Sequence, residues 1–139
     1  MMKIMKNIKI LFVALVLIST SVFGQTVKQK RAERQFNNFS FVKAINTYEK
    51  LIDTSFNKHY AMRKLGDAYI MLRQPEKALE IYKEVVKQEN VPSEYYLYYA
   101  QTLRANGDYE ASKKWMRKFK DAGNEQDSRV KSFFKNDVI

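Results

Sequence analysis

The sequence predicts an all-α fold: three helical hairpins in series, closed by a short C-terminal helix. Positions 34 residues apart keep their character along most of the chain, which is the mark of a repeat architecture. Within each copy, apolar residues recur at intervals of three and four, the period of an α-helix. The 139 residues include only four glycines and two prolines, which argues against a sandwich or barrel rich in tight turns.

The 34-residue period is clearest at small residues. One column holds Ala44, Ala78 and Ser112, and a second holds Ala32, Gly66 and Ala100. Two helices that cross closely need small residues at the crossing and large ones beside it. The large residues form two further columns: Tyr48, Tyr82 and Met116, then Leu51, Val85 and Phe119. Each copy is therefore interpreted as a helical hairpin.

The first two hairpins are placed by their turns and starts. The first copy is predicted as helices over residues 27–37 and 41–53, and Ser40 caps the second of them. Its polar first helix suits the outer face of a terminal repeat. In the second copy a helix is predicted over residues 59–72, and Pro75 opens its partner at the first helical position, where a missing N–H costs nothing.

The third hairpin and the last helix follow the same logic. A helix is predicted to start at Pro92 and Ser93 and to stop at Gly107, and Asp108 caps the next helix. Residues 25–123 thus form three repeats, and residues 124–139 are predicted as a capping helix and C-terminal tail. That helix, which Ser128 caps, presents one apolar face. We expect it to cover the flank of the last repeat, over Trp115, Met116 and Phe119.

Residues 1–24 have the three-part layout of a secretion signal. Three lysines precede nine continuous apolar residues at 10–18, and small or polar residues follow. A membrane-spanning helix needs about 20 apolar residues, so a signal cleaved near Gly24 is predicted over the alternative of an anchor. The mature protein is then expected in the periplasm or associated with the outer membrane, with no transmembrane span of its own.

The composition excludes most catalytic and metal chemistry. The chain has no cysteine and one histidine, which excludes a disulfide scaffold, a thiol nucleophile and a cysteine-ligated zinc. No glycine-rich phosphate loop and no Gly-x-Ser-x-Gly turn occurs. We therefore expect no enzymatic activity, no metal and no cofactor.

The first helix of each hairpin should line a concave groove with the face that avoids the hairpin contacts. Cations there could hold a carboxylate or an acidic peptide, while tyrosine and methionine offer apolar pockets. The alternative is a solvated face. Leu97 is also predicted on this groove face. The residues predicted to bind the partner are Lys30, Tyr60, Arg63, Lys64, Met71, Tyr98, Gln101 and Arg104.

Two other clusters stand out. A basic patch consists of Lys113, Lys114, Arg117 and Lys118; it is either a solvated face or a site for anionic lipid or glycan, and the export signal argues against nucleic acid. Among four tyrosines at 95, 96, 98 and 99, helical geometry is expected to point Tyr96 and Tyr99 into the core and the other two elsewhere. Trp115 is expected to be buried under the last helix.

The small crossing residues, the Gly107-Asp108-Tyr109 turn and the 34-residue period resemble the tetratricopeptide repeat (TPR) family over residues 27–123. The resemblance implies an α-solenoid that binds a protein or peptide, here an exported scaffold with an envelope protein as partner and possible peripheral association with the outer membrane. The array and the segment 127–133 are also similar to the front end of Bacteroidetes-type OmpA-family envelope proteins. That implies the alternative of an N-terminal module serving a secretion or gliding apparatus. The identity of the partner and the oligomeric state stay open.

Overall fold

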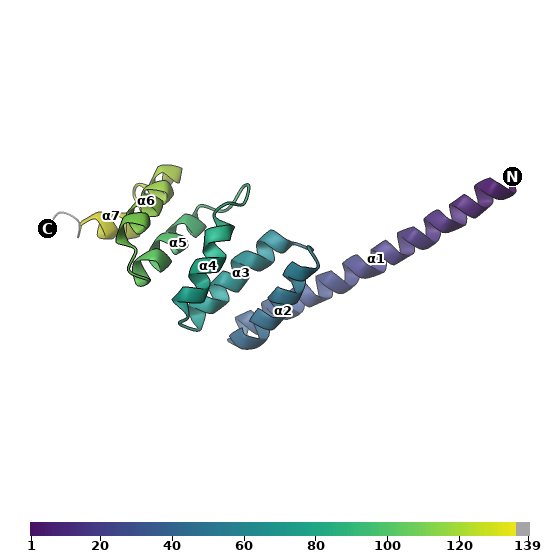
Figure 1. Cartoon of the computed structure of the whole chain (residues 1–139), viewed down its shortest axis with the longest axis horizontal. Coiled ribbons are helices and arrows are strands. Elements are labelled where there is room, and N and C mark those ends of the chain that lie inside the picture. The colour runs from purple at the N-terminus through teal and green to yellow at the C-terminus, as the bar shows by residue number, and fades with distance from the viewer. Residues whose placement is uncertain (136–139) are drawn as a thin grey trace. The chain divides into compact units, whose positions relative to one another are not determined.

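The computed structural model describes residues 1–135, and no strand occurs in that range. The all-α prediction is confirmed (Figure 1). In chain order the elements are α1 (Met2–Asn37), α2 (Phe41–Asp53), α3 (Lys58–Met71), α4 (Pro75–Val85), α5 (Glu94–Ala105), α6 (Tyr109–Phe119), the π-helical turn η1 (Lys120–Asn124) and α7 (Ser128–Lys135). The chain divides into two compact units, Met1–Ala61 and a second from Met62 onward. The tail predicted at residues 136–139 lies outside the described residues.

The first unit is built on the hairpin of α1 and α2. Ala32 and Ala44, the small residues predicted at the crossing, are both fully buried, as is Tyr48. The predicted start of the first helix at residue 27 is wrong, because α1 begins at Met2. No proline interrupts residues 2–26, and the single glycine there, Gly24, does not end the helix.

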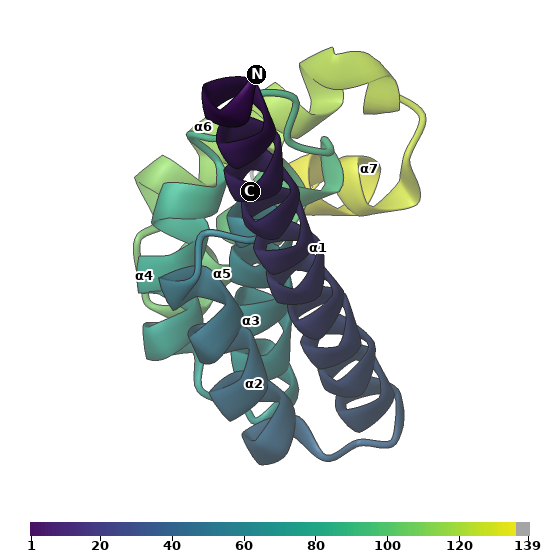
Figure 2. The same cartoon turned by 90° about the vertical axis from the view of Figure 1, so that its right-hand side faces the viewer.

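The N-terminal part of α1 is exposed along residues 2–24. Figures 1 and 2 both show it continuing past α2 as one uninterrupted ribbon. By length and composition α1 could cross a membrane, since an 18-residue window has a mean hydropathy of 2.1 and none of it is buried. A signal sequence near the N-terminus has the same properties. The cleaved signal stays a prediction.

The second unit confirms the repeat register at both of its hairpin crossings. At the crossing of α3 and α4, a β-carbon on Gly66 would lie 2.5 Å from the Tyr82 ring, so only glycine fits. At the crossing of α5 and α6, the buried Ser112 hydroxyl donates to the carbonyl oxygen of Ala100 over 2.7 Å. The small residues are therefore there because the helices touch.

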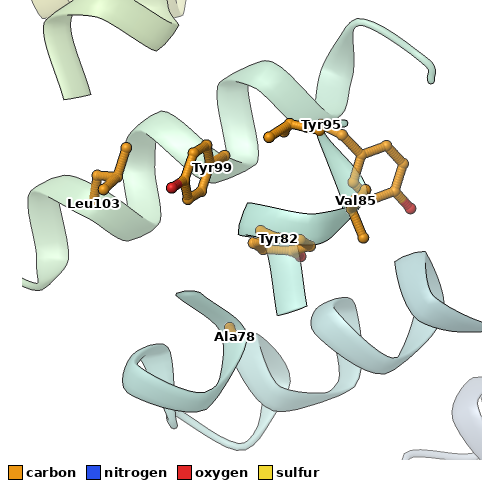
Figure 3. Close-up of a cluster of buried hydrophobic side chains, with 7 residues drawn as sticks. Ala78, Tyr82, Val85, Tyr95, Tyr99 and Leu103 are labelled. Atoms are coloured by element: carbon orange, nitrogen blue, oxygen red, sulfur yellow. The ribbon is translucent and has the colours of Figure 1, made fainter. Parts of the chain in front are cut away.

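Two apolar clusters hold the second unit together. One joins α4 to α5 through Ala78, Tyr82, Val85, Tyr95, Tyr99 and Leu103 (Figure 3). The other joins α5, α6 and α7 through Leu97, Ala100, Met116, Phe119 and Val130. Met116 and Phe119 are at most 1% exposed. The capping role predicted for the last helix is thus confirmed for these two residues.

The helix ends follow local hydrogen bonding. The Asp108 carboxylate accepts the Ala111 N–H over 3.0 Å, as predicted. Ser40 stands at the N-cap of α2, but its side chain makes no capping bond, so that prediction is wrong. At α7 the cap acceptor is Asp127 rather than Ser128, because the Asp127 carboxylate takes the Arg129 N–H over 2.8 Å.

Candidate functional site

A polar cluster in the second unit centres on Asp67 of α3. The Tyr82 hydroxyl donates to one carboxylate oxygen over 2.7 Å, and the Tyr95 hydroxyl donates to the other over 3.0 Å. Burial raises the pKa of Asp67, against the opposing effects of Tyr82, Lys64 and Tyr95. The pKa of Tyr82 is raised by its own burial and by the negative charge of Asp67. Asp67 therefore ties α3 to α4 and α5.

Around this cluster, cations and an aromatic ring share one face. The Arg63 guanidinium donates to the Gln88 side chain over 3.1 Å and lies 5.9 Å from the centroid of the Tyr95 ring. Lys64 Nζ lies 3.8 Å from the Asp67 carboxylate. The Tyr98 ring packs on Tyr95 with centroids 5.4 Å apart. Three of the predicted binding residues are thus brought together on a platform fixed by buried tyrosines.

A pocket of about 510 Å³ lies between α5, α6 and α7 of the same unit. Its residues are Gln101, Arg104, Met116, Ser128, Arg129, Ser132 and Phe133. The Arg104 guanidinium lies 5.3 Å from the centroid of the Phe133 ring. Two of the predicted binding residues, Gln101 and Arg104, therefore line this pocket.

The two arginines of the pocket, Arg104 and Arg129, differ in whether a described carboxylate balances their charge. The Arg129 guanidinium donates two hydrogen bonds to Asp127, at 2.7 Å and 3.0 Å. These bonds and the Arg129 N–H lower the pKa of Asp127 to about 2. Arg104 forms no ion pair with a carboxylate in the part of the chain that the structure describes. The unbalanced charge in the pocket is therefore that of Arg104.

The other predicted binding residues are more scattered. Met71 is half exposed at the end of α3. Lys30 and Tyr60 belong to the first unit, where Lys30 is exposed and the Tyr60 hydroxyl donates to Glu33 over 2.9 Å. A single groove containing all eight predicted residues stays a prediction.

Several predictions about α5 and its neighbours are wrong. Leu97, placed on the groove face, is fully buried, and Tyr95 is only 8% exposed while Tyr96 is half-buried. Trp115 is half-buried and packs on Tyr96 and Tyr99, with centroids 5.7 and 5.1 Å away. The reason is that α5 packs against both α4 and α6, so it buries two faces rather than one.

The basic patch lies on α6. Lys113 Nζ is 3.6 Å from the Glu110 carboxylate, and Lys118 Nζ lies 4.2 Å from the centroid of the Trp115 ring. Lys114 and Arg117 are exposed. Half of the patch is thus engaged by neighbouring side chains of its own helix, which favours the solvated-face interpretation.

The contribution of α7 to the pocket was missed in the sequence. Arg129, Ser132 and Phe133 lie at positions i, i+3 and i+4, which places them on one helical face. The sequence spacing alone could have predicted this shared face. It could not have predicted that these residues lie beside Arg104, because that depends on how η1 reverses the chain, where Gly123 adopts φ 95°.

Comparison with known proteins supports the fold. No family model matches the chain, and no curated protein matches it. Among solved structures, the Yersinia enterocolitica type III secretion translocator chaperone SycD, in an alternative dimer, matches with a TM-score of 0.68 and 14% identity over 81% of this chain and 89% of that chain. SycD in complex with a peptide of the translocator YopD matches with a TM-score of 0.69 and 15% identity, over 80% and 91%.

A third solved structure, a double mutant of MamA RS-1, matches with a TM-score of 0.66 and 17% identity over 75% of this chain and 58% of that one. The chain therefore has a TPR-like helical-repeat fold. The OmpA-type resemblance finds no support among these comparisons and stays a prediction.

Proposed function

We propose that this protein is a non-catalytic scaffold that binds a segment of another protein on the face of α3 and α5 in its second unit. The observation that carries the proposal is the arrangement of Arg63, Lys64 and Tyr98 around the half-buried Asp67 and the buried Tyr82 and Tyr95. Because the platform is already ordered, binding costs little side-chain entropy. Arginine and tyrosine are also the side chains that most often dominate binding energy at interfaces.

The likeness to SycD adds to this proposal. SycD, a chaperone, has been solved with a peptide of the translocator YopD. At 15% identity that likeness concerns the fold, and we extend peptide binding to this chain on the strength of its own half-buried Arg63, Lys64 and Tyr98.

We further propose that the scaffold works at the cell envelope, with an envelope protein as its partner and possible peripheral association with the outer membrane. Support comes from the lysines and the exposed apolar helix of residues 2–24, which suit an export signal. The alternative of an OmpA-like N-terminal module rests on the sequence resemblance alone, so we retain the scaffold.

Site-specific photo-crosslinking in living cells tests the binding face. A photoreactive amino acid replaces Tyr98 in the full chain, and a matched variant carries it at Glu80, an exposed position on α4. We expect one defined adduct from position 98, lost in the Arg63→Ala, Lys64→Ala double variant and retained in Lys114→Ala. Identical adducts from positions 98 and 80, or none from position 98, would contradict the proposal.

A further inference from the structure

The pocket between α5, α6 and α7 combines one unbalanced cation with apolar walls. Arg104 is exposed, and its guanidinium carbon lies 5.3 Å from the centroid of the Phe133 ring. Met116, 1% exposed, supplies buried apolar surface. Gln101 and Ser132 add neutral hydrogen-bonding groups. Such a mixture suits a ligand with one anionic group attached to an apolar body.

The charged side chains described at the pocket favour a ligand with a single negative charge. Arg129 is held by Asp127, and Glu94 adds to the negative charge acting on it. Among residues 1–135, Arg104 is the lining residue whose planar fork of N–H donors has no carboxylate partner, and this fork has the geometry that pairs with a carboxylate through two hydrogen bonds. Packing on the Phe133 ring limits how many orientations the guanidinium adopts, so less entropy is lost when a carboxylate binds.

We propose that this pocket binds an acidic side chain of the partner segment, together with an adjacent apolar residue, through Arg104. The inference rests on the proposed function and names the chemistry of the bound segment: a Glu or Asp next to a Leu or an aromatic residue. A volume of about 510 Å³ leaves room for both side chains. The proposed occupant is an internal side chain rather than a chain terminus, because a nest of backbone N–H groups is what captures a terminal carboxylate, whereas the cation of this pocket is the side chain of Arg104.

The site is completed by the capping helix. Arg104 belongs to α5, but Phe133 and Ser132 belong to α7. Binding therefore depends on the docking of α7, which is held by the burial of Val130 in the apolar cluster that contains Met116 and Phe119. The helix that caps the last repeat also forms one wall of the binding site.

Matched peptides test the proposal with the full chain. The probes are synthetic decapeptides, acetylated and amidated, with Glu next to Leu or Phe at their centre; each has a Glu→Gln twin. A second twin carries Gln and a free C-terminal carboxylate. Binding is measured by fluorescence anisotropy for wild type, Arg104→Ala, Arg104→Lys and Lys114→Ala.

We expect wild type to bind a subset of Glu peptides at least about tenfold more tightly than their Gln twins, the equivalent of about 1.4 kcal/mol. Arg104→Ala should bind both twins equally, Arg104→Lys should keep part of the preference, and Lys114→Ala should keep all of it. The preference should weaken with added salt.

Three results would overturn the inference: a preference that survives Arg104→Ala, an equal loss in Lys114→Ala, or full recovery with the free-terminus twin. Absence of binding by every peptide at millimolar concentration would overturn it as well. The proposed function is judged separately, by the crosslink from position 98. If that adduct persists in Arg104→Ala while the peptides show no acid preference, the scaffold stands and the pocket assignment falls.

Discussion

The Asp67 carboxylate accepts hydrogen bonds from the hydroxyls of Tyr82 and Tyr95. Replacing it with alanine leaves both hydroxyls without that partner, and we expect Asp67→Ala to lower the free energy of unfolding by about 2–4 kcal/mol. Asp67→Asn is the matched control, because it keeps an acceptor oxygen and removes the charge. Urea unfolding followed by circular dichroism measures both.

The same residue predicts a dependence on pH. Burial raises the pKa of Asp67 in the folded chain, so the folded state binds the proton more tightly than the unfolded state does. This contribution to stability is fully present below the ordinary aspartate pKa and is lost as pH rises through the raised value. Relative to Asp67→Asn, wild type should therefore lose stability as the pH rises above the ordinary aspartate pKa of 3.8. Parallel stability profiles for the two proteins would show that the carboxylate is not desolvated.

Gly66 is required by contact rather than by backbone conformation. A β-carbon at this position would meet two atoms of the Tyr82 ring at 2.5 and 2.8 Å, and that ring is held in place by Asp67 and Tyr95. We expect Gly66→Ala to lower the free energy of unfolding by about 1–3 kcal/mol through overpacking. In Gly24→Ala, where nothing lies within 4 Å of the added carbon, thermal unfolding should be unchanged. Equal midpoints for the two variants would place the helix crossing elsewhere.

Among the elements, the turns inside the three hairpins repeat one backbone conformation. Phe39, Arg73 and Gly107 stand 34 residues apart and have φ values of 60°, 56° and 85°. Glycine adopts this left-handed conformation freely, whereas a side-chain-bearing residue pays about 1–2 kcal/mol. Phe39 is also 77% exposed, although its ring lies 6.1 Å from that of Phe41.

We therefore expect Phe39→Gly to raise the free energy of unfolding by up to about 1 kcal/mol, the relief of strain less the greater entropy of glycine in the unfolded chain. Arg73→Gly should act in the same direction, because it occupies the same place in the second hairpin. Both are measured by urea unfolding. A destabilised Phe39→Gly would mean that the contact with Phe41 outweighs the strain.

The docking of α7 predicts the effect of a charge at Val130, which is 3% exposed. Val130→Asp should lower the free energy of unfolding by about 2 kcal/mol or more and promote self-association, because Phe119 and Met116 lose their cover. The neighbouring Lys131→Asp introduces the same side chain at an exposed position and should do neither. Sedimentation velocity and thermal unfolding follow the two effects. A monomeric, stable Val130→Asp would remove the capping assignment.

The packing of the elements also explains how much of the fold the sequence could predict. Repeat positions that hold small residues, flanked by positions that hold large ones, correctly predicted both helix crossings of the second unit, because close helix contact allows only a few residue types there. The faces of α5 were harder: a helix packed on two sides shows no single apolar stripe, so Leu97 and Tyr95 were misplaced. The meeting of Arg104 with Phe133 depends on the turn at η1, whose direction no periodicity encodes.

In the whole molecule, residues 2–24 are a helix without a role in the packing of the repeats, since all of them are exposed. The crossing residue Ala32 lies C-terminal to them, so the hairpin of α1 and α2 keeps its contact after their removal. We therefore expect export with cleavage after Gly24. In a C-terminally tagged full chain expressed in a double-membraned bacterium, the periplasmic product should begin at Gln25 on N-terminal sequencing. The Leu15→Arg, Val16→Arg variant breaks the apolar core and should stay uncleaved in the cytoplasm. An intact chain that leaves the membrane fraction only with detergent would identify α1 as an anchor and confine the scaffold to the membrane surface.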